Sequence, residues 1–337
     1  MKKKTIKINF RYFGALFKPE DNFFTNTLKK MYNVEISDNP DYVFYSVYPE
    51  VKREAKDLSK KGDFVKKISP KLYIFLRKIY SRLNLLFVQD KPKVPQGNFV
   101  KIFFGAENIK PNMEECDWAF SSYFEEEINN PRYMRIPVYM VSDYKLKDFG
   151  SPPFHKKIDF SNLKKEKIKF CNFIYSQEIP KRNELFKLIN SYKKVDSPGR
   201  CMNNMPPISH NTPKESRFSV NWVEEKLKFL KPYKFTISFE NSMNSGYASE
   251  KLTQPMLVNS IPIYVGHKDV SKDFNTKSFI NYSDFKNMKE FIDYIIKVDN
   301  DDELYEKILR EPWYNLNKES YNLRHMRILK RFKDIFG

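Results

Sequence analysis

Short apolar runs alternate with amphipathic segments along the first third of the chain. Alternation and β-branched or aromatic content predict five elements there: strands at Ile6–Phe10, Val34–Ile36, Tyr42–Tyr45 and Val100–Phe104, and a helix over Asn22–Met31. Strands that alternate with helices are typical of an α/β domain with a mostly parallel sheet. We therefore expect a Rossmann-like domain over residues 1–150.

Residues 50–96 interrupt this pattern. Residues 50–67 are densely charged, and Leu72–Phe87 has the spacing of a basic amphipathic helix. The segment therefore differs from the α/β pattern on either side of it. Packing of its helix on the domain is favoured over contact with a lipid surface, although both fit the pattern.

The second half of the chain repeats the α/β pattern. A stretch rich in Pro and Lys over residues 151–166 predicts a linker, and residues 167–316 predict a second Rossmann-like domain. Its predicted elements include a strand at Ile168–Tyr175 and helices at Lys181–Ile189, Met288–Val298 and Asp299–Leu309.

The last residues, 317–337, form a basic amphipathic segment. Tyr321–Phe336 places most apolar side chains on one face of a predicted helix and most basic ones elsewhere. This helix could pack on the first domain, touch anionic lipid, or do both.

The most informative stretch of the second domain runs from Tyr233 to Gly266. Tyr233–Phe239 is a predicted strand, a polar loop follows it, Ser249 is suited to cap a helix, and Ile261–Gly266 is a second strand. In such a βαβ unit, the loop and the helix N-terminus form a crevice that favours a phosphate.

Charged residues fit this interpretation. Lys251 and Arg182 each fall in the first turn of a predicted helix, where a cation opposes the helix dipole and a bound anion would offset that cost. Glu250 could accept hydrogen bonds from sugar hydroxyls, and Tyr247 could pack on a ring. A solvated Glu250–Lys251 pair on a surface helix is the alternative.

Composition narrows the partners. Sixty Lys and Arg residues against 42 Asp and Glu give a net charge of +18, which favours an acidic partner. The basic residues are dispersed and match no nucleic-acid motif, so we expect no nucleic-acid partner. A non-enzymatic protein that binds anionic membrane remains an alternative.

Cysteine and histidine usage points to a metal-free protein in a reducing compartment. Cys116, Cys171 and Cys201 are isolated, which favours reduced thiols, and no apolar run is long enough to span a bilayer. The expected location is the cytoplasm, with peripheral contact with the inner membrane surface left open. Neither the histidines nor the acidic residues 299–303 have metal-ligand spacing.

Several motifs, taken together, resemble one enzyme family. Phe239-Glu240-Asn241-Ser242, followed by Tyr247-x-Ser249-Glu250-Lys251, is similar to the motif of the α-1,3/4-fucosyltransferases of glycosyltransferase family 10, in particular the bacterial Lewis-antigen type. Ser249 stands where the family has Thr. Similar stretches occur at residues 101–108 and 195–201, and the resemblance covers about residues 98–316. Compared with bacterial members of the family, residues 50–96 look like an insertion.

The resemblance implies a GT-B fold, with two Rossmann-like domains facing across a cleft. The donor would be GDP-fucose, bound by the second domain, and the acceptor a GlcNAc-containing glycan bound by the first. Transfer would invert the anomeric centre, with the 3-hydroxyl favoured over the 4-hydroxyl, on Lewis-antigen, lipopolysaccharide or protein-linked glycans. A GT-B enzyme that uses another nucleotide-sugar is the alternative.

The same resemblance assigns roles to individual residues. Glu107 would be the general base, and Glu250 would be a second catalytic carboxylate as well as a donor ligand. The remaining donor-binding residues would be Arg182, Asn241, Tyr247 and Lys251. Arg182 and Lys251 would neutralise the diphosphate, so no obligatory metal or other cofactor is expected.

Overall fold

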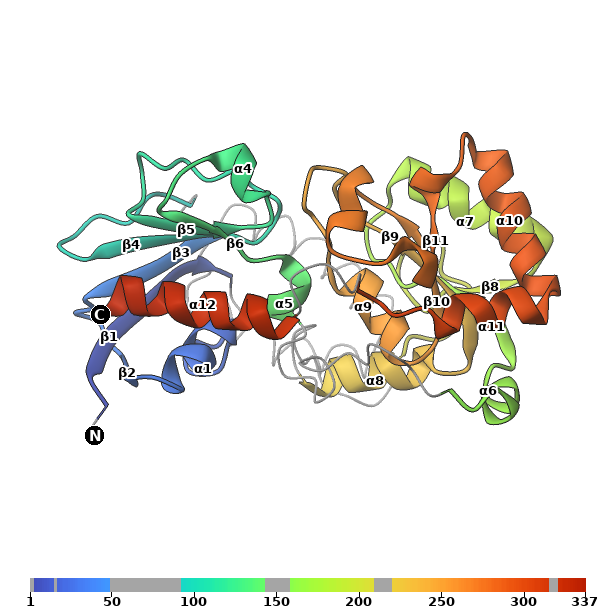
Figure 1. Cartoon of the computed structure of the whole chain (residues 1–337), viewed down its shortest axis with the longest axis horizontal. Coiled ribbons are helices and arrows are strands. Elements are labelled where there is room, and N and C mark those ends of the chain that lie inside the picture. The colour runs from blue at the N-terminus through green and yellow to red at the C-terminus, as the bar shows by residue number, and fades with distance from the viewer. Residues whose placement is uncertain (1–2, 15–16, 49–91, 143–157, 209–219, 315–320) are drawn as a thin grey trace, which may run out of the picture. The chain divides into compact units, whose positions relative to one another are not determined.

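The chain folds into two compact units. The structure is a computed structural model that describes residues 3–14, 17–48, 92–142, 158–208, 220–314 and 321–337. Unit 1 comprises Met1–Ser121, Glu125–Arg135 and Arg331–Gly337, and unit 2 comprises Ser122–Phe124 and Ile136–Lys330 (Figure 1).

Unit 1 is built on a parallel sheet of six strands, in the order β2-β1-β3-β4-β5-β6. The strands are β1 (Thr5–Phe13), β2 (Asn33–Ile36), β3 (Tyr42–Tyr48), β4 (Val100–Gly105), β5 (Trp118–Ser121) and β6 (Tyr133–Arg135). Apolar side chains bury the central strands on both faces, as expected of parallel strands. Two short helices, α1 (Phe23–Lys29) and α4 (Glu125–Ile128), accompany the sheet, and Asn22 caps α1.

The end of the C-terminal helix α12 (Tyr321–Phe336) belongs to unit 1. Phe332 and Phe336 are both fully buried, and the Phe336 ring lies 4.5 Å from the Tyr42 ring, centroid to centroid. Lys4 Nζ also donates to the carbonyl oxygen of Phe336 at 2.8 Å. The predicted packing of this helix on the first domain is therefore observed.

Unit 2 is built on a second parallel sheet, in the order β11-β10-β9-β7-β8. Its strands are β7 (Lys169–Asn172), β8 (Val195–Asp196), β9 (Tyr233–Phe239), β10 (Ile261–Val265) and β11 (Ile280–Asn281). The order reverses direction between β7 and β9, and ligands of open α/β sheets bind at the carboxyl ends of the strands at such a point.

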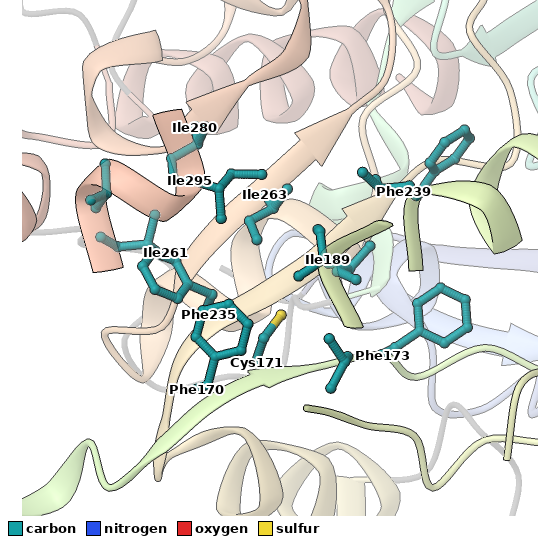
Figure 2. Close-up of a cluster of buried hydrophobic side chains, with 14 of the residues drawn as sticks. Phe170, Cys171, Phe173, Ile189, Phe235, Phe239, Ile261, Ile263, Ile280 and Ile295 are labelled. Carbon is teal, nitrogen blue, oxygen red and sulfur yellow. The ribbon is translucent and has the colours of Figure 1, made fainter. Parts of the chain in front are cut away.

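Helices cover this sheet and close its core. The helices are α5 (Val138–Ser142), α6 (Phe160–Glu166), α7 (Pro180–Tyr192), α8 (Val220–Leu230), α9 (Glu250–Leu257), α10 (Met288–Asn300) and α11 (Asp302–Arg310), with 3₁₀ turns η1 (Lys268–Lys272), η2 (Thr276–Ser278) and η3 (Tyr282–Asp284). Figure 2 shows Phe170, Phe235, Ile261, Ile263 and Ile295 gathered in the core between strands and helices. No described helix has both the length and the apolar character needed to cross a bilayer.

The predicted domain limits differ from the observed units. Residues 160–166, which we assigned to the linker, form helix α6, and Phe160 and Leu163 lie in the core of unit 2. Two apolar residues three positions apart are enough to bury one face of a short helix among lysines. The main segment of unit 2 also begins at Ile136 rather than after residue 150, and Ser122–Phe124 belongs to unit 2 as well.

The predicted boundary between the helices Met288–Val298 and Asp299–Leu309 was also wrong. Asp299 lies in the last turn of α10, and Asp301 caps α11 by accepting from Leu304 N. Asp299 is buried because Lys234 Nζ and Lys193 Nζ reach its carboxylate at 2.8 and 3.1 Å. The predicted helix Leu72–Phe87, residues 151–157 of the linker and residues 317–320 lie outside the described residues.

Candidate functional site

The candidate site residues of unit 2 lie in the segments that follow β7 and β9. Because these strands flank the reversal of strand order, their carboxyl ends mark the expected ligand position. Glu240–Ser249 follows β9 and leads into α9, and Tyr175 and Arg182 follow β7.

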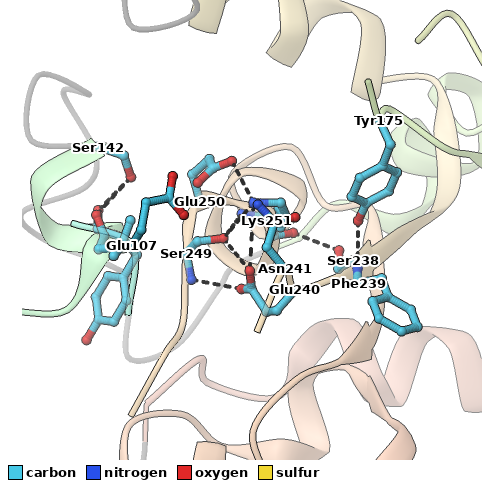
Figure 3. A network of polar contacts seen from close by, with 12 residues as sticks. Glu107, Ser142, Tyr175, Ser238, Phe239, Glu240, Asn241, Ser249, Glu250 and Lys251 are labelled. Atoms are coloured by element: carbon cyan, nitrogen blue, oxygen red, sulfur yellow. Dashed lines mark hydrogen bonds and ion pairs between the residues drawn. The ribbon is translucent and has the colours of Figure 1, made fainter. Parts of the chain in front are cut away.

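Glu240 and Ser249 close the loop after β9. Glu240 is fully buried, and its carboxylate accepts from Ser249 N at 2.8 Å and from Ser249 Oγ at 2.6 Å (Figure 3). Ser249 is the N-cap of α9, as predicted, because its Oγ accepts from Lys251 N. A loop that is tied at both ends in this way presents the N-terminus of α9 in a fixed position.

Lys251 lies in the first turn of α9 among two carboxylates. Its Nζ lies 3.3 Å from Glu250 Oε1 and 3.8 Å from Glu240 Oε2 (Figure 3). Burial alone would lower the pKa of Lys251, but Glu250 and Glu240 raise it above its ordinary value, so the side chain is charged. Burial would raise the pKa of Glu250, whereas Lys251 and Lys226 lower it to about 2.

Arg182 lies in the first turn of α7, but it is buried rather than open to solvent. Its guanidinium stacks on the Tyr175 ring at 4.0 Å, and its Nη2 donates to Asn241 Oδ1 at 2.7 Å. Only 1% of the residue is exposed, and Nε has no hydrogen-bond partner among the described residues. From the sequence we expected a bound anion to offset this charge; in the structure the Tyr175 ring and the Asn241 oxygen also lie against it.

Tyr175 joins β7 to the loop after β9. Its hydroxyl donates to Ile237 O at 3.0 Å and accepts from Phe239 N at 2.6 Å (Figure 3). Burial raises the pKa of Tyr175 to about 12, although Arg182 and Lys251 both act to lower it. Both cations therefore lie close enough to act on the same hydroxyl, and both also contact Glu240.

Gly199 explains part of the motif at residues 195–201. A Cβ at this position would lie 2.1 Å from Tyr175 O and 2.8 Å from Tyr175 N, so only glycine lets the loop pass. Cys201 N donates to the same carbonyl oxygen, and Cys201 Sγ lies 3.0 Å from Asn183 Oδ1. Residues 199–201 thus pack against the backbone of Tyr175.

Two further predicted residues lie in the same loop. Asn241 is exposed and holds Arg182, as described above. Tyr247 is buried, which differs from the exposed ring that stacking on a ligand would suggest. The structure thus brings Arg182, Asn241, Tyr247, Glu250 and Lys251 together around Glu240.

Glu107 belongs to unit 1, where it follows β4. It is exposed, and its Oε1 accepts from the Tyr48 hydroxyl at 2.7 Å. Because β3 and β4 are paired and parallel, the residues at their carboxyl ends meet at one edge of the sheet. A Cβ at Gly105 would lie 2.6 Å from Ile109 O, so this glycine permits the tight turn that carries Glu107.

Three contributors were absent from the predicted site: Glu240, Tyr175 and Tyr48. Strand polarity could have indicated all three, because each lies at or just beyond the carboxyl end of a strand next to the reversal of strand order or to Glu107. Among the described residues, no group of three His, Cys, Asp or Glu side chains is placed to hold a metal ion.

The chemistry of the site follows from these charges. Two buried or half-buried cations and the N-terminus of α9 converge where a phosphate would be favoured, and Glu250 is held ionised beside them. An ionised carboxylate accepts hydrogen bonds from hydroxyls. Unit 2 therefore has the features of a site for a phosphorylated, hydroxyl-rich ligand.

Comparison with known proteins identifies the family. A model described as the C-terminal part of glycosyltransferase family 10 (fucosyltransferase) matches residues 163–329, and a model of the α-(1,3)-fucosyltransferase FucT N-terminal domain matches residues 71–142. The chain belongs to glycosyltransferase family 10. The match to the FucT N-terminal domain includes residues 71–96, which we assigned to an insertion.

Two relatives are similar to part of the chain. A putative fucosyltransferase of Acanthamoeba polyphaga mimivirus is 36% identical over 55% of this chain and 32% of its own length. The α-(1,3)-fucosyltransferase FucT of Helicobacter pylori is 34% identical over 71% of this chain and 53% of its own length. The chain thus spans about a third and about half of these two relatives.

A solved structure shares the fold. The crystal structure of an α1,3-fucosyltransferase with GDP-fucose superimposes with a TM-score of 0.69 at 24% identity, covering 99% of this chain and 91% of that chain. The two parallel-sheet units and this likeness confirm the predicted GT-B fold.

Proposed function

We propose that this family 10 protein is an inverting fucosyltransferase that uses GDP-fucose. The observation that carries the proposal is the cluster of Arg182, Lys251 and Glu250 at the carboxyl edge of the second sheet. The two cations would compensate the charge of a diphosphate, and the ionised carboxylate would accept hydrogen bonds from sugar hydroxyls. The matched family models, and the structural neighbour that was solved with GDP-fucose, support the identity of the nucleotide-sugar.

The donor half of the reaction requires a leaving group whose charge is compensated. As the bond between the anomeric carbon and the β-phosphate oxygen breaks, GDP takes the electron pair and gains negative charge. Lys251 and the N-terminus of α9 would stabilise that charge. Arg182 would add positive potential and hold Asn241 in place. Glu250 would bind donor hydroxyls and support the positive charge that develops on the sugar ring.

The acceptor half requires one base. The acceptor oxygen attacks the anomeric carbon opposite the leaving group, and Glu107 would take the hydroxyl proton. Tyr48 holds one carboxylate oxygen of Glu107, which fixes the direction of the other. Unit 1 would thus supply the base and unit 2 would bind the donor.

The proposed acceptor is a GlcNAc-containing glycan, modified at its 3-hydroxyl. The α-(1,3) linkage in the names of the Helicobacter pylori relative and of the family model that matches residues 71–142 supports the 3-hydroxyl. The GlcNAc unit is what the motif resemblance implies. Fucosylation of such acceptors on lipopolysaccharide or protein-linked glycans would give Lewis-type antigens.

A donor panel tests the proposal. Purified protein is incubated with N-acetyllactosamine and, in separate reactions, GDP-fucose, GDP-mannose, UDP-galactose or UDP-GlcNAc, each with and without EDTA. We expect transfer from GDP-fucose alone, with α-configured product by NMR and no loss of rate in EDTA. Transfer from another donor would replace the proposed donor, and retention of configuration would exclude inversion.

A further inference from the structure

Helix α12 begins in unit 2 with a buried ion pair. Arg324 Nη1 lies 3.1 Å from Asp273 Oδ1, and only 1% of the Asp273 side chain is exposed. The same nitrogen donates to the Tyr139 hydroxyl at 2.6 Å. One guanidinium thus ties α12 to the residue after η1 and to helix α5.

Tyr139 connects this ion pair to the loop that precedes α9. Its backbone N–H donates to Ala248 O at 3.2 Å, and α5 packs against α9. Ala248 is fully buried and directly precedes Ser249, the residue that caps α9 and binds Glu240. The Tyr139 ring has little freedom, because it lies edge-on to Phe274 with the centroids 5.1 Å apart.

A series of contacts within unit 2 connects Asp273 to Ala248. Asp273 fixes Arg324, Arg324 fixes the hydroxyl of Tyr139, and the backbone of Tyr139 fixes Ala248. Glu240 holds the next residue, Ser249, by accepting from its backbone N–H and its hydroxyl. The tie through Tyr139 comes from outside the segment between β9 and α9, and it acts at the residue next to the helix cap.

We infer that Arg324 and Tyr139 are positioning residues for the donor site. Through Ala248 they set the position of Ser249, and hence of Glu250 and Lys251, without contact with the donor. The inference rests on the proposed function in one respect, since it takes the ligand of this site to be a guanosine diphosphate. A hydrogen bond to a charged donor holds geometry more strongly than a neutral one, which suits the link between Arg324 and Tyr139 to this role.

Two variants probe the link without opening a large cavity. Tyr139→Phe removes only the hydroxyl, and Arg324→Lys keeps the charge beside Asp273 but loses the planar fork that reaches Tyr139. The matched control is Tyr192→Phe, which removes a hydroxyl that donates to buried Asp299 at 3.0 Å in the same unit. The readouts are GDP affinity by calorimetry, thermal stability, and amide hydrogen exchange of residues 139 and 247–252 in the ligand-free protein.

Both variants should weaken GDP binding by roughly two- to thirtyfold, the usual effect of a residue that acts through its neighbours. They should also speed exchange at the amide of residue 139 and at residues 247–252. Tyr192→Phe should leave both readouts unchanged even where it lowers the melting temperature. In turnover, the KM for GDP-fucose should rise while the KM for the acceptor stays the same.

The readouts separate the two hypotheses. Unchanged exchange and unchanged GDP affinity in Tyr139→Phe and Arg324→Lys would overturn the inference and leave the proposed function intact. A wild-type protein that binds no GDP would overturn the proposed function. In that case exchange alone decides whether Arg324 positions the loop, and unchanged exchange would reject it.

Discussion

At the scale of single residues, the structure separates the groups that could do chemistry from those that hold them. Glu107 is exposed and held at one oxygen by Tyr48, whereas Glu240 is buried and holds Ser249 at both oxygens. An exposed carboxylate with one oxygen held is suited to proton transfer. A buried carboxylate whose two oxygens both accept short hydrogen bonds is suited to fixing a loop.

Glu107→Gln should lower fucose transfer by roughly 10²- to 10⁴-fold, because an amide cannot take the acceptor proton. GDP affinity should not change, since Glu107 belongs to unit 1 and the donor cluster to unit 2. Single-turnover rates and calorimetry measure the two effects. Glu35→Gln, the same change at an exposed position on β2, is the control; near-normal transfer by Glu107→Gln would exclude the role.

Lys251→Ala should weaken GDP binding and slow transfer, because the cation would compensate the diphosphate in both ground state and transition state. Loss of one charge-assisted contact corresponds to about 1.5–3 kcal/mol, or roughly 10- to 150-fold in Kd. Arg182→Ala should have an effect in the same direction and also lower stability, since the side chain is buried. Lys181→Ala, the exposed neighbour of Arg182, is the control. Unchanged Kd for GDP in both variants would contradict the assignment.

Acid should destabilise unit 2 through Glu250. Lys251 and Lys226 hold the pKa of Glu250 near 2, below the value of about 4.3 in an unfolded chain. The unfolded state therefore binds more protons between these values, and stability falls as the pH drops from about 4.3 toward 2. The contribution that is lost is up to about 3 kcal/mol. The difference in free energy of unfolding between wild type and Glu250→Gln should shrink between pH 5 and pH 3; a difference independent of pH would contradict it.

Much of the site at this scale could be predicted from local sequence. Ser249 as a cap and Lys251 in the first helical turn follow from neighbouring residues, because capping is a local interaction. The burial of Glu240 and Arg182 could not be predicted. Glu240 depends on a residue nine positions away, and Arg182 depends on Tyr175 and Asn241, which the fold brings from separate segments.

At the scale of elements, packing on unit 1 accounts for the amphipathic pattern of α12. Its apolar face is buried at Phe332 and Phe336, while Met326 is 63% exposed. The buried face accounts for the amphipathic pattern without lipid. Contact of its basic face with anionic lipid remains a prediction, which a vesicle sedimentation assay at low salt would test.

Phe336→Ala should destabilise unit 1 by about 3–5 kcal/mol, the usual cost of truncating a buried phenylalanine. Its ring contacts Tyr32, Tyr42, Phe44 and Phe332, so the change opens a cavity among aromatic side chains. Urea unfolding can be followed with Trp118, after Trp222 and Trp313 are replaced by phenylalanine. Met326→Ala should lie within about 0.5 kcal/mol of wild type. Equal effects in the two variants would show that α12 does not contribute to this core.

Several elements with clear apolar periodicity were predicted well, whereas helices α6 and α8 were not predicted. The spacing of apolar residues predicts strands β9 and β10 and helix α7. Helix α6 was missed because its lysines resemble a linker, although Lys164 forms an ion pair with Asp302 at 3.0 Å. The position of Asp299 at the end of α10 depends on Lys193 and Lys234 from other elements, which local sequence does not reveal.

At the scale of the whole molecule, a net charge of +18 raises the question of specific against general anion binding. Dispersed surface cations bind polyanions through long-range attraction, which salt screens with a Debye length of about 8 Å at physiological ionic strength. A half-buried cation such as Lys251, whose side chain is 17% exposed, is screened less.

GDP binding should therefore resist salt. Between about 0.05 and 0.5 M NaCl, the Kd for GDP should rise by less than about tenfold, whereas binding to anionic vesicles or heparin should fall by several orders of magnitude. Calorimetry and vesicle sedimentation across the salt series measure the two. A parallel loss of both would favour a general anion-binding protein over a nucleotide-sugar enzyme.

Gly199 has a consequence for how variants of this protein should be interpreted. The residue has no side chain, yet a single added methyl group would clash with the backbone of Tyr175, whose ring stacks on Arg182. An alanine at this position would thus mimic the loss of a nucleotide contact in a binding screen. Screens that assign ligand residues from lost affinity would count Gly199 among them, although the added methyl group acts through Tyr175.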